Sequence, residues 1–220
     1  MSNKWLTTAA LAAGLVAIPN AASADTQWRL FGGVSDVDDL SDGRMQGPYY
    51  GYTIDQIDTE SGFVVGAAFG VNTGNWTAEV ELAHREWGVS DDDVQVNWTG
   101  YYGGDYYYNF GVDGDLTANS LMANAWYNFP AGGNFSFYAG GGAGIAEVEG
   151  DTGVAFSTYY DSEVPDVNGT HFAWQLGAGV QLKTDSGFSY GIGYRYFNVD
   201  NIGDLGFDVK AHEVVFEFRF

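Results

Sequence analysis

Cysteine is absent from this chain of 220 residues, which excludes both a disulfide framework and a thiolate metal site. Basic residues are scarce: 8 Lys and Arg stand against 29 Asp and Glu, and the net charge of −21 argues against binding nucleic acid through a basic patch. Beyond the N-terminal residues, no stretch has the roughly 18 consecutive apolar residues of a transmembrane helix, which excludes a helical inner-membrane protein.

The N-terminal residues have the order of a secretory signal peptide. A single positive charge, Lys4, precedes an apolar run over residues 6–18, and the small residues Ala22 and Ala24 follow. The run is too short for a comfortable membrane-spanning helix. We therefore predict a signal peptide over residues 1–24.

The last nine residues alternate strictly between two kinds of side chain, which indicates a strand with two different faces. One face is apolar apart from its first residue and comprises His212, Val214, Phe216, Phe218 and Phe220. The other face comprises Glu213, Val215, Glu217 and Arg219.

A period of two recurs along the chain, clearly in some segments and diluted by Gly and Ala in others. The segments are residues 28–34, 63–71, 76–85, 120–129, 135–148, 174–183 and 189–196. With the C-terminal segment they make about eight strands of roughly nine to fourteen residues, a length that suits a tilted strand crossing a bilayer.

The connections between these strands alternate in length. Short turns lie at residues 72–75, 130–134 and 184–187, and long polar segments at residues 35–62, 88–115, 149–170 and 199–208. The long segments hold 21 of the 29 acidic residues and a single base, Arg44.

Outer-membrane barrels have short periplasmic turns and longer extracellular loops. We therefore predict that residues 25–220 form an all-β domain, an eight-stranded antiparallel transmembrane up-and-down β-barrel. It would lie in the bacterial outer membrane with both termini periplasmic and the long acidic loops extracellular. A soluble β-sandwich or ligand-binding barrel would not explain the loop asymmetry together with the aromatic C-terminus.

Aromatic residues gather where strands meet turns, as amphipathic rings do at membrane interfaces. We expect an inner girdle of Trp28, Trp76, Phe129, Phe135, Phe188, Phe218 and Phe220. We expect Trp87, Trp174 and Tyr196 toward the outer interface. Glycines from Gly140 to Gly144 are expected to leave room for Trp126 to point inward.

The export signal, residues 174–180 (Trp-Gln-Leu-Gly-Ala-Gly-Val), residues 191–196 (Gly-Ile-Gly-Tyr-Arg-Tyr) and the aromatic C-terminus together carry a family resemblance. The chain resembles the outer-membrane protein β-barrel domain family of opacity proteins and surface antigens, porin-like barrels of Gram-negative bacteria. The resemblance implies partners in periplasmic chaperones and the outer-membrane assembly machinery, with Phe216, Phe218 and Phe220 as the C-terminal assembly signal. It implies no reaction.

The polar strand faces predict a charge network in the lumen, because an eight-stranded barrel is filled by side chains and buried charges need partners. Its members are Arg29, Glu79, Glu81, Arg85, Arg195, Glu213, Glu217 and Arg219. Counted from the turns, Arg85, Arg195 and Glu213 form an outer layer and the other five an inner one. The network either neutralises itself or acts as a gate, which single-channel conductance after replacing Glu79 and Glu81 with Ala would test.

Enzymatic and metal sites have little support. His84 and His212 fall on the lipid-facing side, and no Ser follows either at the two-residue spacing that resembles a lipid A deacylase. The acidic clusters at residues 36–43 and 91–93 lack the calcium-loop pattern, since Leu40 and Tyr49 stand where oxygen ligands are needed. We predict no catalytic residue, no metal and no cofactor.

The segment over residues 97–110 is rich in Tyr, which supplies contact area at low entropic cost. A recognition surface there would comprise Trp98, Tyr101, Tyr102, Tyr106, Tyr107 and Tyr108, although the segment could equally extend strands beyond the membrane. The main hypothesis is thus a surface-interaction protein in contact with lipid and lipopolysaccharide, with an unknown extracellular ligand and no nucleic acid. The alternatives are a narrow porin-like channel for small solutes and, less favoured, a lipid-modifying enzyme.

Overall fold

The computed structural model describes residues 25–38, 40–46, 51–57, 59–99, 105–152, 168–202 and 207–220. Every regular element within these ranges is a strand. No helix there has the length and apolarity to cross a membrane. The predicted signal peptide, residues 1–24, lies outside the described residues.

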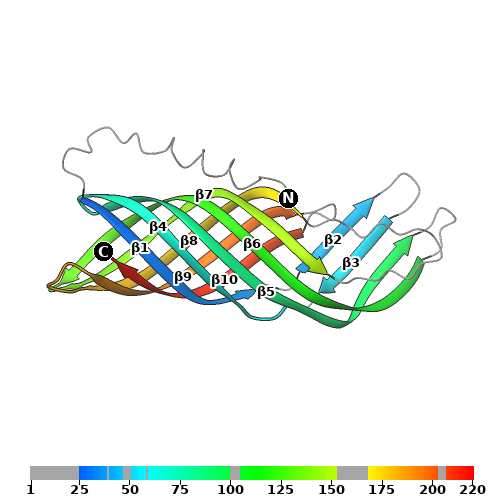
Figure 1. Cartoon of the computed structure of the whole chain (residues 1–220). Helices are drawn as coiled ribbons and strands as arrows, with labels where there is room; N and C mark the ends of the chain where they lie inside the picture. The colour runs from blue at the N-terminus through cyan, green and yellow to red at the C-terminus, as the bar shows by residue number, and fades with distance from the viewer. Residues whose placement is uncertain are drawn as a thin grey trace, which may run out of the picture.

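Eight antiparallel strands close into a barrel, and each strand runs diagonally to the barrel axis (Figure 1). They are β1 (Asp25–Val37), β4 (Gly62–Thr73), β5 (Trp76–Thr99), β6 (Asp105–Gly132), β7 (Phe135–Thr152), β8 (Gly169–Lys183), β9 (Ser189–Ile202) and β10 (Phe207–Arg219). The chain ends meet at the β1–β10 pairing, where Trp28 N donates to Phe220 O at 2.7 Å and Phe220 N donates to Trp28 O at 3.0 Å. The predicted eight-stranded antiparallel barrel is confirmed.

The two ends of the barrel differ. Three short turns, each with glycine in the left-handed region, lie at the end near the C-terminus (Figure 1), which we call the short-turn end. Their glycines include Gly74 at φ 61° and Gly187 at φ 88°, values that residues with a Cβ rarely adopt. The predicted short turns are confirmed.

At the opposite, far end the wall continues into a second sheet. β4 pairs with β5 only as far as Glu86, whereas β5 and β6 remain paired to Thr99 and Asp105. A hairpin of β2 (Leu40–Gln46) and β3 (Gly51–Ile57) adds to β5 there (Figure 1). We call β2, β3, residues 90–99 of β5 and residues 105–113 of β6 the projecting sheet.

The prediction of long loops over residues 35–62 and 88–115 is therefore wrong for most of both segments, and the alternative that residues 97–110 extend strands is confirmed for residues 97–99 and 105–110. Their Asp, Gly and Asn content is typical of loops, but the backbone is held in strands by cross-strand pairing. Strand propensity depends strongly on such context. The composition of one segment could not show which other segment pairs with it.

The outer surface of the barrel wall is apolar, and the charged side chains of its strands are buried inside. On β10, Phe216 is 67% exposed, whereas its neighbours Val215 and Glu217 are buried. Leu82 on β5 is likewise exposed and lies beside the buried Glu81. Buried charges behind an exposed apolar shell suit a barrel in lipid and exclude the soluble β-sandwich.

Candidate functional site

A network of buried charges occupies the short-turn half of the lumen. Nη1 of Arg29 lies 2.9 Å from Oε1 of Glu217, and its Nη2 lies 2.6 Å from Oε2 of Glu81 and also pairs with Glu79. Arg195 joins them through Glu217 at 2.6 Å and Glu81 at 3.3 Å. With Arg219, whose Nη2 lies 2.8 Å from Oε2 of Glu217, these residues form what we call the charged cluster.

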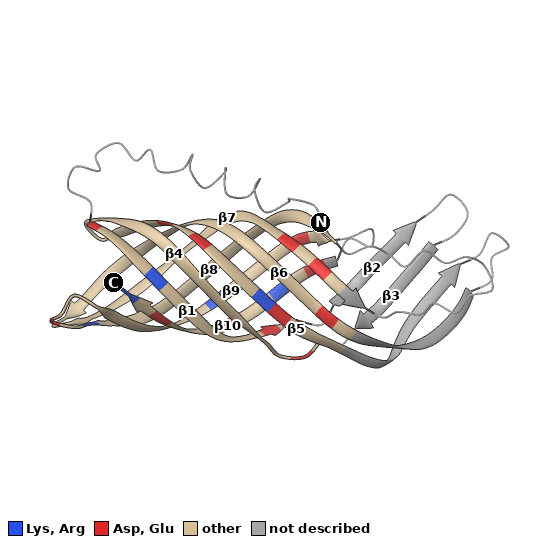
Figure 2. Cartoon of the chain, viewed as in Figure 1, with Lys and Arg blue, Asp and Glu red and all other residues tan. Residues whose placement is uncertain are grey.

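The charged cluster is electrically balanced. It contains three arginines and three glutamates, all at most 5% exposed: Arg29, Arg195, Arg219, Glu79, Glu81 and Glu217. Figure 2 shows the Lys and Arg positions of the barrel strands as blue bands. Because burying an unpaired charge costs several kcal/mol, this neutrality is a condition for a stable barrel.

Arg85 and Glu213 form a separate pair toward the far end. Nε of Arg85 lies 2.6 Å from Oε1 of Glu213, and its Nη1 donates to Oγ of Ser120 at 2.8 Å. The guanidinium also lies 3.6 Å from the ring centroid of Phe197, a cation–π contact.

The predicted outer layer is therefore wrong about Arg195. Arg195 pairs in register with Glu213, yet its guanidinium bonds to Glu217, four residues farther along β10. Barrel strands tilt, so residues opposite each other in register lie at different heights along the axis. Counting from the turns ignores this tilt and the reach of a long arginine side chain.

Uncharged polar groups complete the cluster, and the predicted network omitted two of these residues, Asn124 and Gln175. Asn124 donates to Glu79 at 3.2 Å and to Glu81 at 3.1 Å, and Gln175 donates to Glu81 at 3.1 Å. Trp126 Nε1 donates to Oε1 of Glu79 at 2.7 Å. Their inward positions on β6 and β8 follow from the same alternation, which would have identified them.

Aromatic side chains fill the space beside the glycines of the wall. A Cβ on Gly140 would lie 2.9 Å from Cε3 of Trp126, which confirms the prediction that Trp126 points inward there. Tyr138, which the sequence did not single out, fills the equivalent space beside Gly179 and Gly193: a Cβ on Gly179 would lie 2.5 Å from its Oη. The glycines thus accommodate rings rather than an open lumen.

A chain of side-chain hydrogen bonds crosses the lumen wall at the short-turn end. It joins five residues on five strands: Gln181 donates to Asn128 (2.9 Å), Asn128 to Thr77 (3.1 Å), Thr77 to Asn72 (2.6 Å) and Asn72 to Gln27 (3.1 Å). We call this set the amide belt. It adds a neutral polar layer between the charged cluster and the short-turn end.

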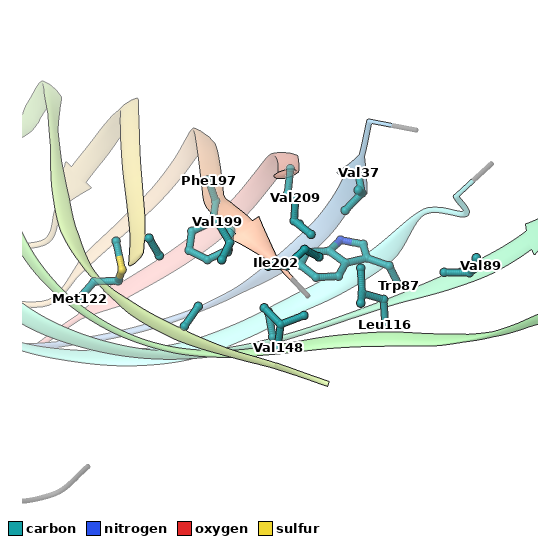
Figure 3. Packing of buried hydrophobic residues seen from close by; sticks show 14 residues of the cluster. Val37, Trp87, Val89, Leu116, Met122, Val148, Phe197, Val199, Ile202 and Val209 are labelled. Carbon is teal, nitrogen blue, oxygen red and sulfur yellow. The ribbon is translucent and has the colours of Figure 1, made fainter. Parts of the chain in front are cut away.

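The far half of the lumen is apolar (Figure 3). We call its buried cluster the apolar plug: Val37, Trp87, Val89, Leu116, Ala118, Met122, Ala146, Val148, Ala173, Phe197, Val199, Ile202, Val209 and Ala211. The placement of Trp87 at the outer lipid interface is wrong, since it is 1% exposed and its Nε1 donates to Oγ of Ser35 at 2.8 Å. Trp87 shares the odd-numbered, inward parity of Glu81 and Arg85 on β5.

Outward-facing polar groups lie nearer the far end of the wall. Nδ1 of His212 lies 2.6 Å from Oη of Tyr194, and its Nε2 lies 3.3 Å from Oδ1 of Asp38. His84 similarly lies 2.8 Å from Oδ1 of Asn119. Both histidines are about two-fifths exposed on the outer surface, as the alternation predicts.

The residues predicted for recognition are described only in part. Tyr101 and Tyr102 lie outside the described residues. For Trp98, Tyr106, Tyr107 and Tyr108, in the projecting sheet, the structure describes the backbone alone. Of the acidic clusters, Asp39 and the side chains of residues 42–43 and 91–93 also lie outside what is described.

Comparison with known proteins gives one family and a set of similar structures. The model of the outer membrane protein beta-barrel domain matches residues 8–220. The structure is similar to that of Neisserial surface protein A, with 12% identity, a TM-score of 0.54, and coverage of 90% of this chain and 97% of that chain. Ail, the attachment invasion locus protein of Yersinia pestis, solved in complex with the heparin analogue sucrose octasulfate, is 17% identical over 89% of this chain and 99% of that chain, with a TM-score of 0.44. No curated protein matches the sequence.

Proposed function

Since the chain belongs to the outer membrane protein beta-barrel domain family, we propose that it is a non-enzymatic surface protein whose closed barrel anchors the projecting sheet outside the cell. The observation that carries this proposal is the continuation of β5 and β6 beyond the barrel wall. Ten residues of strand, from Ser90 to Thr99, reach roughly 33 Å along the strand direction. A sheet of this size is not needed to close a barrel, so it favours an external role.

The filled lumen favours an anchor over the alternative of a narrow porin-like channel. The amide belt, the charged cluster and the apolar plug lie in series along the axis. We expect no steady conductance from the protein in planar bilayers. Because the apolar plug and the amide belt would remain, replacing Glu79 and Glu81 with Ala should not open the lumen. Conductance after the glutamate replacements alone would instead support the gate.

The outward-facing histidines favour contact with the membrane interface over lipid-modifying chemistry. His212 is held between a carboxylate and a phenol, and His84 contacts an amide. These groups can face lipopolysaccharide headgroups while the apolar wall faces acyl chains. Mass spectrometry of lipid A from cells with and without the protein tests this, and a changed acylation pattern would contradict a non-enzymatic role.

The orientation can be tested with single cysteines, because the natural chain has none. Gln95→Cys lies in the projecting sheet, and Ser186→Cys lies in a turn at the short-turn end. A membrane-impermeant maleimide should label the first on intact cells and the second only after the outer membrane is permeabilised. The reverse pattern would overturn the proposed orientation.

The predicted assembly partners extend this proposal. Phe216 and Phe220 are exposed on the outer surface of the closing strand, and the ring centroids of Phe218 and Phe220 lie 5.5 Å apart. This aromatic edge is available to the outer-membrane assembly machinery before the barrel closes, and to periplasmic chaperones during transit.

A further inference from the structure

We infer that one face of the projecting sheet is a docking surface for a basic amphipathic peptide segment of a partner protein. This inference rests on the proposed function, in which the projecting sheet stands outside the cell. It is carried by the register of the four strands, which sorts their residues onto two chemically different faces.

The first face is apolar except at its base, where Asp91 is paired with Val112. Residues paired directly across neighbouring strands share a face, and every second residue along a strand returns to it. The register gives it the rows Met45–Tyr52–Trp98–Tyr106, Gly43–Ile54–Val96–Tyr108 and Val94–Phe110. We call these residues the apolar face.

The second face carries the charges. The intervening rows are Arg44–Thr53–Asn97–Tyr107 and Gln46–Gly51–Thr99–Asp105. Asp42 and Asp55 have the same parity as Arg44 and Thr53, so they belong to this face too. Asp113 also belongs to this face, because it has the parity of Asp105 and Tyr107 on β6, and Asp92 and Asp93 lie in the irregular stretch at the base of the sheet.

A bulge in β5 brings the apolar residues together. Between the pairs Asp91–Val112 and Val94–Phe110, β5 advances by three residues while β6 advances by two. The extra residue switches the parity of β5, so its even-numbered residues share a face with the even-numbered residues of β6. On β6 these positions continue the row that carries Met122 and Trp126 inside the lumen. Without the bulge, Val94, Val96 and Trp98 would continue the lipid-facing row.

The dimensions of the apolar face fit a peptide. Four strands at roughly 4.8 Å spacing and about five residues at 3.3 Å give about 19 Å by 17 Å, on the order of 300 Å². A stable interface between globular proteins needs about 800 Å² on each partner. A single helix, about 10–12 Å across, fits within this width.

The negative charge of the chain favours a partner with positive charge. Within the projecting sheet Arg44 is the only base against seven aspartates, and the whole chain has a net charge of −21. This field repels anionic ligands and a second copy of the chain, and attracts a basic segment. Aromatic rings on the apolar face can also receive lysine or arginine side chains through cation–π contacts.

The test uses the full-length protein in phosphatidylcholine nanodiscs and a labelled amphipathic helical peptide of leucine and lysine. Fluorescence anisotropy measures binding, with empty nanodiscs subtracted as background. The matched variants are Val96→Lys on the apolar face and Asn97→Lys on the charged face, which add the same charge at neighbouring positions. Resistance of the folded barrel to SDS at room temperature checks that each variant folds.

We expect Val96→Lys to weaken binding about tenfold or more, because the added charge would have to be desolvated against the peptide, and Asn97→Lys to weaken it less than about threefold. A peptide with glutamate in place of lysine should not bind. Equal weakening by both variants would mean attraction by charge alone and would overturn the docking face. Absence of binding to the unmodified protein would overturn it too, the face then being covered by the chain itself. If Gln95→Cys is labelled on intact cells while binding fails, the inference fails and the proposed function stands.

Discussion

Replacing Glu81 with Gln tests whether charge balance holds the barrel together. Glu81 is fully buried and accepts hydrogen bonds from Arg29 at 2.6 Å, Arg195 at 3.3 Å and Gln175 at 3.1 Å. Glutamine keeps the shape but leaves three arginines against two glutamates. Breaking a buried charge network in this way costs about 3–5 kcal/mol. With an m-value on the order of 3 kcal/mol per molar urea, the unfolding midpoint should fall by roughly 1–2 M.

Urea titration of the protein in phospholipid vesicles, followed by tryptophan fluorescence, measures this shift. Glu86→Gln is the matched control, because Glu86 is 44% exposed and lies 3.7 Å from His84. The control should lose less than about 1 kcal/mol. Glu81→Gln combined with Arg29→Met restores neutrality, so it should be more stable than the sum of the two single losses predicts. Equal midpoints for Glu81→Gln and Glu86→Gln, or a double variant that loses the full sum, would refute the reasoning.

Three further perturbations test other parts of the molecule. Trp87→Ala should lower the free energy of unfolding by about 3–5 kcal/mol in the same titration, because it leaves a cavity in the apolar plug. Trp76→Ala, at a lipid-facing position, is the control. An equal effect of the two variants would contradict the buried position of Trp87. Gly193→Ala should lower the free energy of unfolding by about 1–3 kcal/mol, because the new Cβ crowds the Tyr138 hydroxyl. Adding Tyr138→Phe should restore stability, because the nearest remaining ring atom, Cζ, is 3.3 Å from the new Cβ. If the loss persists in the double variant, the strain lies elsewhere. Phe220→Ala keeps both backbone hydrogen bonds to Trp28, so refolding of the purified protein in detergent should be unchanged. The amount of folded barrel in cell membranes should fall. If refolding in detergent falls as well, Phe220 is structural rather than an assembly signal.

Much of the barrel could be predicted from local patterns. The alternation from His212 to Phe220 identifies the closing strand and both of its faces, and glycine-containing segments mark the short turns, as at Gly74 and Gly187. The inward parity of Glu81, Glu217 and Arg219 follows from the same period. The two faces of a strand follow from backbone geometry that repeats every two residues, so the sequence of one strand is enough to predict them.

The arrangement inside the lumen could not be predicted in the same way. The contacts of Arg195 with Glu217, of Gln175 with Glu81, and of Tyr138 with the space beside Gly193 join strands far apart in the chain. They depend on strand tilt and on side-chain reach, neither of which a local period contains. The interior position of Trp87 could have been predicted from the sequence, because Trp87 has the same odd-numbered parity on β5 as Arg85.

By itself, the sequence determined the fold class, the eight wall strands, the short turns and the list of charges that face inward, because alternation and turn chemistry are local. Only the tertiary structure decided that Arg195 belongs to the charged cluster, that an apolar plug fills the far half of the lumen, and that β2, β3, β5 and β6 project as a sheet. Barrel closure sets the heights of neighbouring strands, and the single extra residue between Asp91 and Val94 turns one strand over. Both effects arise from how strands pair, and pairing is a property of two segments rather than one.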